Sequence, residues 1–258
     1  DLSFEPSPAP SSDDTESQTE SRGPTEWSTP PRNIDGWSAR PPAGPLAQVS
    51  FHGHRCSLSL FSNANCSVQG AHVVAHASDL RVTAGFEKFM VIPSGKLNLD
   101  RRSNRVFLDA NLHIAYDHGK WAFIPLYEDL SRMNFALRRL QLQPAPGETE
   151  PPSRNSEGFT PHEEVFPRKY RDFHIVPFST WGNEIPITRK VHVDQKECRV
   201  YLPPWTNPDD TPALPKATLH CSPYFITYKA YLALKQPGVH APLYPREVDL
   251  VIKNGKLM

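Results

Sequence analysis

Short apolar runs separated by polar turns make up the middle of the chain. AHVVAH (71–76) and RVFL (105–108) are short runs rich in β-branched and apolar residues, and they predict two strands. KWAFIPL (120–126) predicts a third strand, which Pro125 confines to the edge or the end of a sheet. We therefore expect small sheets built from short strands.

One helix is predicted between the second and third of these strands. DANLHIAYDHG (109–119) begins with Asp109, a residue suited to the N-cap, and ends at Gly119, a residue that stops helices. Leu112 and Tyr116 lie four residues apart and therefore share one face. The sequence thus defines both ends and one face of this helix.

The remaining elements are less sharply defined by pattern alone. LSRMNFALRRLQL (130–142) fits a helix or a strand, and its periodicity does not decide between them. FHIVPF (173–178) and VHVD (191–194) predict strands, while ATLHCSPYFITYKAYLALK (217–235) predicts a helix whose start Pro223 leaves open. The expected fold class is α+β, with short strands and few helices.

Proline and acidic residues are concentrated in two segments. Residues 1–46 contain nine Pro and few aliphatic residues, which predicts a disordered tail because little apolar surface offsets the entropy of ordering. Residues 141–167 have a similar composition and predict a flexible linker or loop. Structured parts are therefore expected at 47–140 and 168–258.

The net charge of zero, from 28 basic and 28 acidic residues, conceals an uneven distribution. The tail has 3 basic and 8 acidic residues and segment 141–167 has 1 and 5, so they carry −5 and −4. Residues 47–140 have 11 and 7 and residues 168–258 have 13 and 8, or +4 and +5. Since the local field steers binding, overall neutrality does not exclude a polyanionic partner.

Compartment is indicated by what the chain lacks. It contains no run of about 18 apolar residues, so no transmembrane helix is predicted and no membrane partner is expected. Its first residues do not resemble a signal peptide. Four Cys are too few and too scattered for a disulfide scaffold. We therefore expect an intracellular protein, cytoplasmic or nuclear.

Four polar residues between positions 76 and 117 suggest a catalytic or metal-binding site. His113 and Asp117 lie one turn apart on the predicted helix, where an imidazole and a carboxylate can share one divalent cation. His76 ends a predicted strand, and a neutral imidazole is a suitable general base. Asn104 precedes a strand in a polar turn, where its amide can brace a loop or orient a His.

The order of these residues resembles the HNH nuclease family, a ββα-metal fold. The family pattern is a Cys-x-x-x-Gly turn, a strand ending in Ala-His, an Asn before a short strand, and Leu-His-x-x-x-Asp on a helix. Residues 97–125, with LD…N…L…LH…(F/Y)D…W.F.P, look like the fungal HNH-domain proteins, and HCSPYFITYKAYLAL resembles their closing segment. The resemblance covers roughly 56–140 plus that segment. It implies an HNH-like core at 47–140 with a family-specific region at 168–258 packed on it.

By position, the resemblance assigns a role to each candidate residue. His76 becomes the general base that activates water, and Asn104 the residue that orders the loop and fixes the geometry of His76. His113 and Asp117 become ligands of one divalent cation. The implied reaction is hydrolysis of a phosphodiester bond in nucleic acid, with DNA as the expected substrate, by a hydrolase of the endonuclease type.

The cation and the phosphate contacts follow from the same resemblance. Mg²⁺ fits a site with few protein ligands, whereas Mn²⁺, Zn²⁺ or Ni²⁺ tolerate a His ligand better, and the choice stays open. Arg101, Arg102 and Arg105 flank Asn104 and are expected to contact phosphates. As an alternative, the same three arginines belong to a solvated loop.

Several departures from the family pattern favour a different class of function. Ala75 stands where some members of this fold have a metal-binding His or Asp. In addition, 27 residues separate His76 from Asn104, which implies an insertion between the two halves of the motif. The alternative is a catalytically degenerate HNH fold that binds nucleic acid or a protein partner without cleaving anything.

Other histidines and cysteines leave two further alternatives. His52, His54, Cys56 and Cys66 could form a zinc site in a structural or interaction protein, but only some of them have the close spacing of zinc ligands. The sequence favours buried, apolar-like roles for both of these cysteines. His72 lies four residues before His76 on the same predicted strand and could assist or replace it as the base.

Overall fold

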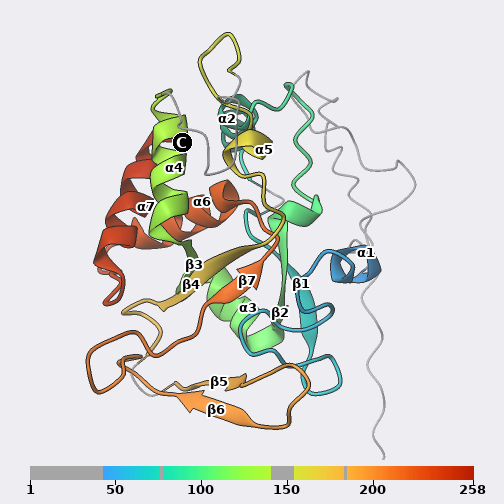
Figure 1. Ribbon diagram of the computed structural model, residues 1–258, viewed down its shortest axis with the longest axis vertical. Helices are drawn as coiled ribbons and strands as arrows, with labels where there is room; N and C mark the ends of the chain where they lie inside the picture. The colour runs from blue at the N-terminus through green and yellow to red at the C-terminus, as the bar shows by residue number, and fades with distance from the viewer. Residues whose placement is uncertain (1–42, 76–77, 141–153, 183–184) are drawn as a thin grey trace, which may run out of the picture.

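The protein has a mixed α/β fold, seen in a computed structural model that describes residues 43–75, 78–140, 154–182 and 185–258 (Figure 1). Within these residues the strands form three small antiparallel sheets. They pair β1 (Val68–His72) with β2 (Arg105–Asp109), order β3 (Trp121–Pro125), β4 (Arg171–Pro177) and β7 (Ala217–Leu219), and pair β5 (Ile187–Lys190) with β6 (Cys198–Tyr201).

Helices pack against the β1–β2 pair and against β3 of the three-stranded sheet. The described helices are α1 (Ala43–Ala47), α2 (Leu80–Met90), the short 3₁₀ helix η1 (Arg102–Asn104), α3 (Ala110–Asp117), α4 (Tyr127–Leu137), α5 (His162–Val165), α6 (Pro223–Leu234) and α7 (Pro245–Leu257). Helix α6 packs against β3, and α4 and α7 pack against each other (Figure 1). No helix in the described residues is both long and apolar enough for a membrane span.

The local predictions around α3 are confirmed. The Asp109 carboxylate accepts a hydrogen bond from the backbone N–H of Leu112 at 3.1 Å and so caps the helix. Gly119 follows the helix with a φ of +63°, a left-handed conformation that glycine adopts without strain. Strand β3 lies at the edge of its sheet, as Pro125 requires.

Three other expectations need correction or completion. Segment 130–142, left open between helix and strand, contributes to helix α4. Residues 191–194 are not a strand but part of the turn between β5 and β6, which the bond from Val191 N–H to the Glu197 carbonyl closes. The helix predicted over 217–235 is split into β7 and α6, because Pro223 has no N–H to continue a helix and instead occupies its first turn.

The strand predicted over 71–76 begins earlier and ends at His72. Val73 and Val74 leave the ladder, since the backbone of Val74 bonds to the side chain of Asn104 instead of to a neighbouring strand. Residue 76 itself lies outside the described residues.

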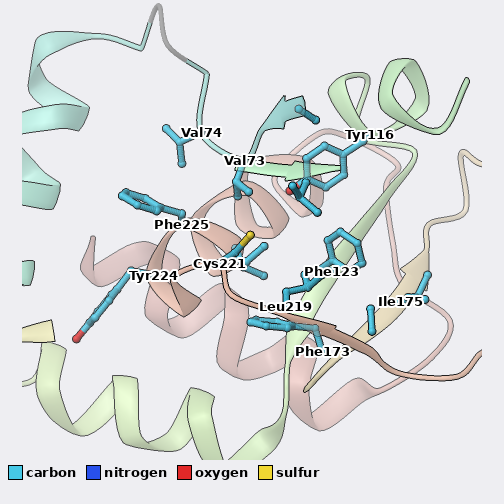
Figure 2. Close-up of a cluster of buried hydrophobic side chains, with 14 of the residues drawn as sticks. Val73, Val74, Tyr116, Phe123, Phe173, Ile175, Leu219, Cys221, Tyr224 and Phe225 are labelled. Carbon is cyan, nitrogen blue, oxygen red and sulfur yellow. The ribbon is translucent and has the colours of Figure 1, made fainter. Parts of the chain in front are cut away.

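A hydrophobic core joins the early and late parts of the chain. Figure 2 shows Val73, Tyr116 and Phe123 packed with residues from beyond position 168, including Phe173 and Phe225. The same cluster takes in residues on either side of the expected domain limits, namely Leu46, Phe159, Val165 and Phe166. Thus the described part of the acidic segment 141–167 includes core residues, while 1–42 and 141–153 lie outside the described residues.

Candidate functional site

Strands β1 and β2 and helix α3 form a compact unit. The strands are antiparallel with His72 opposite Arg105, and α3 starts directly after β2 and contacts both strands (Figure 1). The indole N–H of Trp121 donates to the carbonyl of Leu112 at 3.1 Å, which ties α3 to the next sheet. Side chains from β1 and α3 therefore meet on a rigid frame.

His113 and Asp117, the predicted pair, do lie together on α3. The Nε2 atom of His113 is 3.3 Å from Oδ2 of Asp117, and its Nδ1 atom is 3.0 Å from Oε1 of Gln69 on β1. The side chain of His113 is 18% exposed and that of Asp117 is 54% exposed, so the pair opens to solvent on the Asp117 side.

The chemistry of these donors fits a cation. With Oε1 of Gln69 as acceptor, the Nδ1 atom of His113 carries the ring proton and the lone pair of a neutral ring lies on Nε2. That lone pair and the Asp117 carboxylate are two acceptors 3.3 Å apart, an arrangement that a proton or a metal ion stabilises. Metal-bound histidines commonly donate their other N–H in this way.

Asn104, the predicted brace for the general base His76, makes three side-chain hydrogen bonds. His76 lies outside the described residues. Asn104 is fully buried, and its side chain accepts from Val74 N–H at 2.9 Å and donates to the carbonyls of Val74 and Leu99 at 2.9 and 2.7 Å. It therefore fixes the backbone two residues before His76 against the turn that contains Leu99.

The turn that contains Asn104 is held from the other side by the C-terminal region. Carbonyls within 102–105 accept hydrogen bonds from Nε2 of His220 at 3.0 Å, the thiol of Cys221 at 3.2 Å and the N–H of Ser222 at 2.9 Å. Burial lowers the pKa of His220 to about 4, although its bond to the Arg102 carbonyl opposes the shift. The imidazole is therefore neutral at pH 7.

The three predicted phosphate-binding arginines line a surface pocket of about 500 Å³. Arg102 is exposed and Arg101 is half-buried, so both can reach a ligand. Arg105 is 5% exposed, and its guanidinium lies so close to Gly70 that a Cβ there would stand 2.6 Å from it. The expected cluster is thus two accessible cations and one that is largely enclosed.

A lysine that the sequence analysis did not single out completes the surroundings of the pair. Lys229 of α6 places Nζ 4.0 Å from Oδ1 of Asp117 and 4.9 Å from the ring centroid of Tyr116. Burial lowers the pKa of Lys229, and the Asp117 charge opposes that shift. Its signal in the sequence is that it is the one charged residue in the helix PYFITYKAYLAL. Gln69 had no comparable signal.

The alternative zinc site receives no support from the described residues. No group of three or more His, Cys, Asp or Glu side chains able to hold a metal ion occurs among them, so the zinc site at His52, His54, Cys56 and Cys66 is wrong. Cys56 is fully buried, as expected of an apolar-like residue. His72 pairs with Asp100, with Nε2 2.9 Å from Oδ1.

Comparison with known families matches one segment of the chain. Residues 56–124, just over a quarter of the chain, match the family model described as HNH endonuclease. The match supports an HNH-like domain in this part of the chain and, in general, a nuclease-type function on nucleic acid; such families generally use divalent metal ions. No curated protein and no solved structure matches the chain.

Proposed function

We propose that the protein is a metal-dependent endonuclease that hydrolyses phosphodiester bonds, with DNA as its substrate and a ββα-metal core of the fungal HNH type within residues 47–140. The observation that supports this most is the His113–Asp117 pair, which opens to solvent from α3 inside the family-matched segment. The family-specific pattern around it, LD…N…LH…D, supports the fungal subclass.

In this proposal His113 and Asp117 hold the cation, with Mg²⁺ as the first candidate and Mn²⁺, Zn²⁺ or Ni²⁺ as the others. A bound cation supplies positive charge for the scissile phosphate and the leaving oxygen. Gln69 keeps the ring proton of His113 on Nδ1, so that Nε2 remains a ligand.

The protein's own residues supply the remaining steps. His76 takes the proton of the attacking water, and Asn104 supports that role by fixing the backbone at Val74. Arg101 and Arg102 contact phosphates on either side of the cleaved bond and orient the strand. Each of these roles needs only a neutral imidazole, a buried amide or a fixed positive charge.

Nicking of supercoiled plasmid tests the proposal. Wild type, His76→Ala and Asp117→Ala are incubated with Mg²⁺, Mn²⁺, Zn²⁺ or Ni²⁺, and with EDTA. His192→Ala, which removes an exposed histidine from the turn after β5, is the matched control. We expect nicking by wild type and the control, and a loss of about 100-fold or more in the two site variants.

Two outcomes would contradict the proposal in different ways. If wild type is as inert as His76→Ala with every metal, the protein is not an endonuclease, and the non-cleaving HNH fold becomes the better account. If His76→Ala and Asp117→Ala nick as fast as wild type, the activity belongs to another site.

A further inference from the structure

The position of Lys229 does not contribute clearly to the stability of the fold. The buried residues of α6 include Tyr224, Phe225 and Ala230, and a lysine among them loses hydration. Among the described residues it pairs with Asp117 at 4.0 Å, where the carboxylate is more than half exposed and the lysine side chain is only 18% exposed. A pair this long with one partner in solvent contributes little, and it does not offset the hydration that the lysine loses.

The fold nevertheless holds this ammonium firmly beside the pair on α3. Gly119, just after α3, allows close approach to α6, since a Cβ there would meet the Cβ of Ala233 at 3.2 Å. The face of the Tyr116 ring supports the lysine at 4.9 Å. Lys229 therefore has a fixed, largely buried place beside the exposed carboxylate of Asp117.

Such a position has two opposite consequences. A positive charge beside Asp117 repels a divalent cation bound by the pair. For charges a few ångström apart in a high dielectric, this repulsion lowers the affinity for the cation by roughly tenfold. The same charge attracts a phosphate that approaches the pair, and a lysine binds phosphate as a point charge.

We propose that Lys229 is a phosphate-binding residue of this site, supplied by the C-terminal region, and that it reduces cation affinity when nucleic acid is absent. The inference rests on the proposed function only in taking His113 and Asp117 as cation ligands and nucleic acid as the phosphate source. Lys229 lies outside the family-matched segment 56–124, so the match does not assign it a role. Its ligand is a phosphodiester oxygen of the nucleic acid backbone.

Two binding measurements on the full chain test this inference without using activity. Lys229→Met keeps the length of the stem and its packing on Tyr116 but removes the charge. Mn²⁺ binding is followed by electron paramagnetic resonance, and binding of a fluorescent DNA duplex is followed by anisotropy in EDTA over a range of salt concentrations. Lys235→Met, at the end of the same helix and exposed, is the matched control.

We expect the two affinities to move in opposite directions. Lys229→Met should bind Mn²⁺ about tenfold more tightly, and should bind DNA about three- to tenfold more weakly, with a salt slope smaller by about 1. Lys229→Arg, which keeps the charge, should retain DNA binding near the wild-type level. The control should change neither affinity by more than about twofold.

Other outcomes overturn the inference. Unchanged Mn²⁺ and DNA affinities in Lys229→Met would do so, as would a parallel loss of both with a lowered melting temperature, which is what a merely structural lysine predicts. If Lys229→Met does not fold, a loss of DNA affinity in Lys229→Arg decides against it. Plasmid nicking is a separate test. If wild type does not nick plasmid but Lys229→Met still changes the Mn²⁺ and DNA affinities in opposite directions, the proposed nuclease activity is rejected and this inference stands.

Discussion

Residues 56–124 and residues 217–234 meet at the candidate site and contribute to it differently. The first segment contains the pair His113 and Asp117 and the buried Asn104, on elements that follow one another closely in the chain. The second segment holds the turn 102–105 through His220 to Ser222 and brings Lys229 to Asp117.

The first segment carries the side chains proposed for metal binding, and the second, apart from Lys229, carries groups that hold the fold around them. The spacing of the first group follows from the geometry of one helix and one turn, so these residues form a motif that can be recognised in the sequence. Except for Lys229, the second group acts through hydrogen bonds to backbone carbonyls and through packing, which many sequences satisfy. A family match limited to 56–124 therefore contains the proposed ligands but not all of the structure that orients them.

The largest effect is expected when residues 141–258 are removed. A chain that ends after residue 140 would expose Trp121 and Phe123, which β4 and α6 cover, and each such side chain contributes about 1.5–3 kcal/mol by burial. We expect it to lose its near-ultraviolet circular dichroism and its cooperative unfolding in urea. A chain lacking only residues 1–42 keeps the described core and serves as control. Cooperative unfolding of the truncated chain would show that the first segment folds alone.

A smaller effect is expected at Asn104, on which both segments converge. Asn104→Ala removes one acceptor and two donors and leaves the Val74 and Leu99 backbone groups buried without these bonds. We predict that the free energy of unfolding falls by about 3–5 kcal/mol in urea titrations. Asn98→Ala, at an exposed amide that accepts from Asp100 N–H, should cost less than about 1 kcal/mol. Similar losses in the two variants would refute the bracing role.

The pH dependence of stability tests the contribution of His220. Its pKa is about 4 in the fold and about 6.5 in the unfolded chain, so the unfolded chain binds more protons between these values. Stability from this group is therefore present above pH 6.5 and is lost as the pH falls toward 4. Burial lowers the pKa of His174 to about 4 as well, and Lys169 acts on His220 in the same direction as burial, so a variant is needed to isolate His220.

His220→Gln keeps a donor for the Arg102 carbonyl but cannot titrate. We expect wild type to lose about 1–3 kcal/mol more unfolding free energy than this variant between pH 7 and pH 4.5. Urea titrations at the two pH values measure the difference. Parallel losses in the two proteins would show that His220 is protonated as readily in the fold as in the unfolded chain.

The sequence predicted elements whose ends are set locally and missed those set by distant contacts. Asp109 and Gly119 determine the ends of α3, so this helix and the spacing of His113 and Asp117 could be predicted. The end of β1 depends on a side chain 30 residues away, and the turn after β5 interrupts an apolar alternation that favoured a strand. Lys229 reaches the pair only through the packing of α6 on β3, which no spacing reveals.

Metal binding by the pair on α3 is the central claim, and it can be measured directly. Mn²⁺ is titrated into wild type, Asp117→Ala and the control His192→Ala, and free ion is quantified by electron paramagnetic resonance. We expect one bound equivalent in wild type and the control, and an affinity lower by at least about tenfold in Asp117→Ala. Equal binding by wild type and a folded Asp117→Ala would contradict the claim.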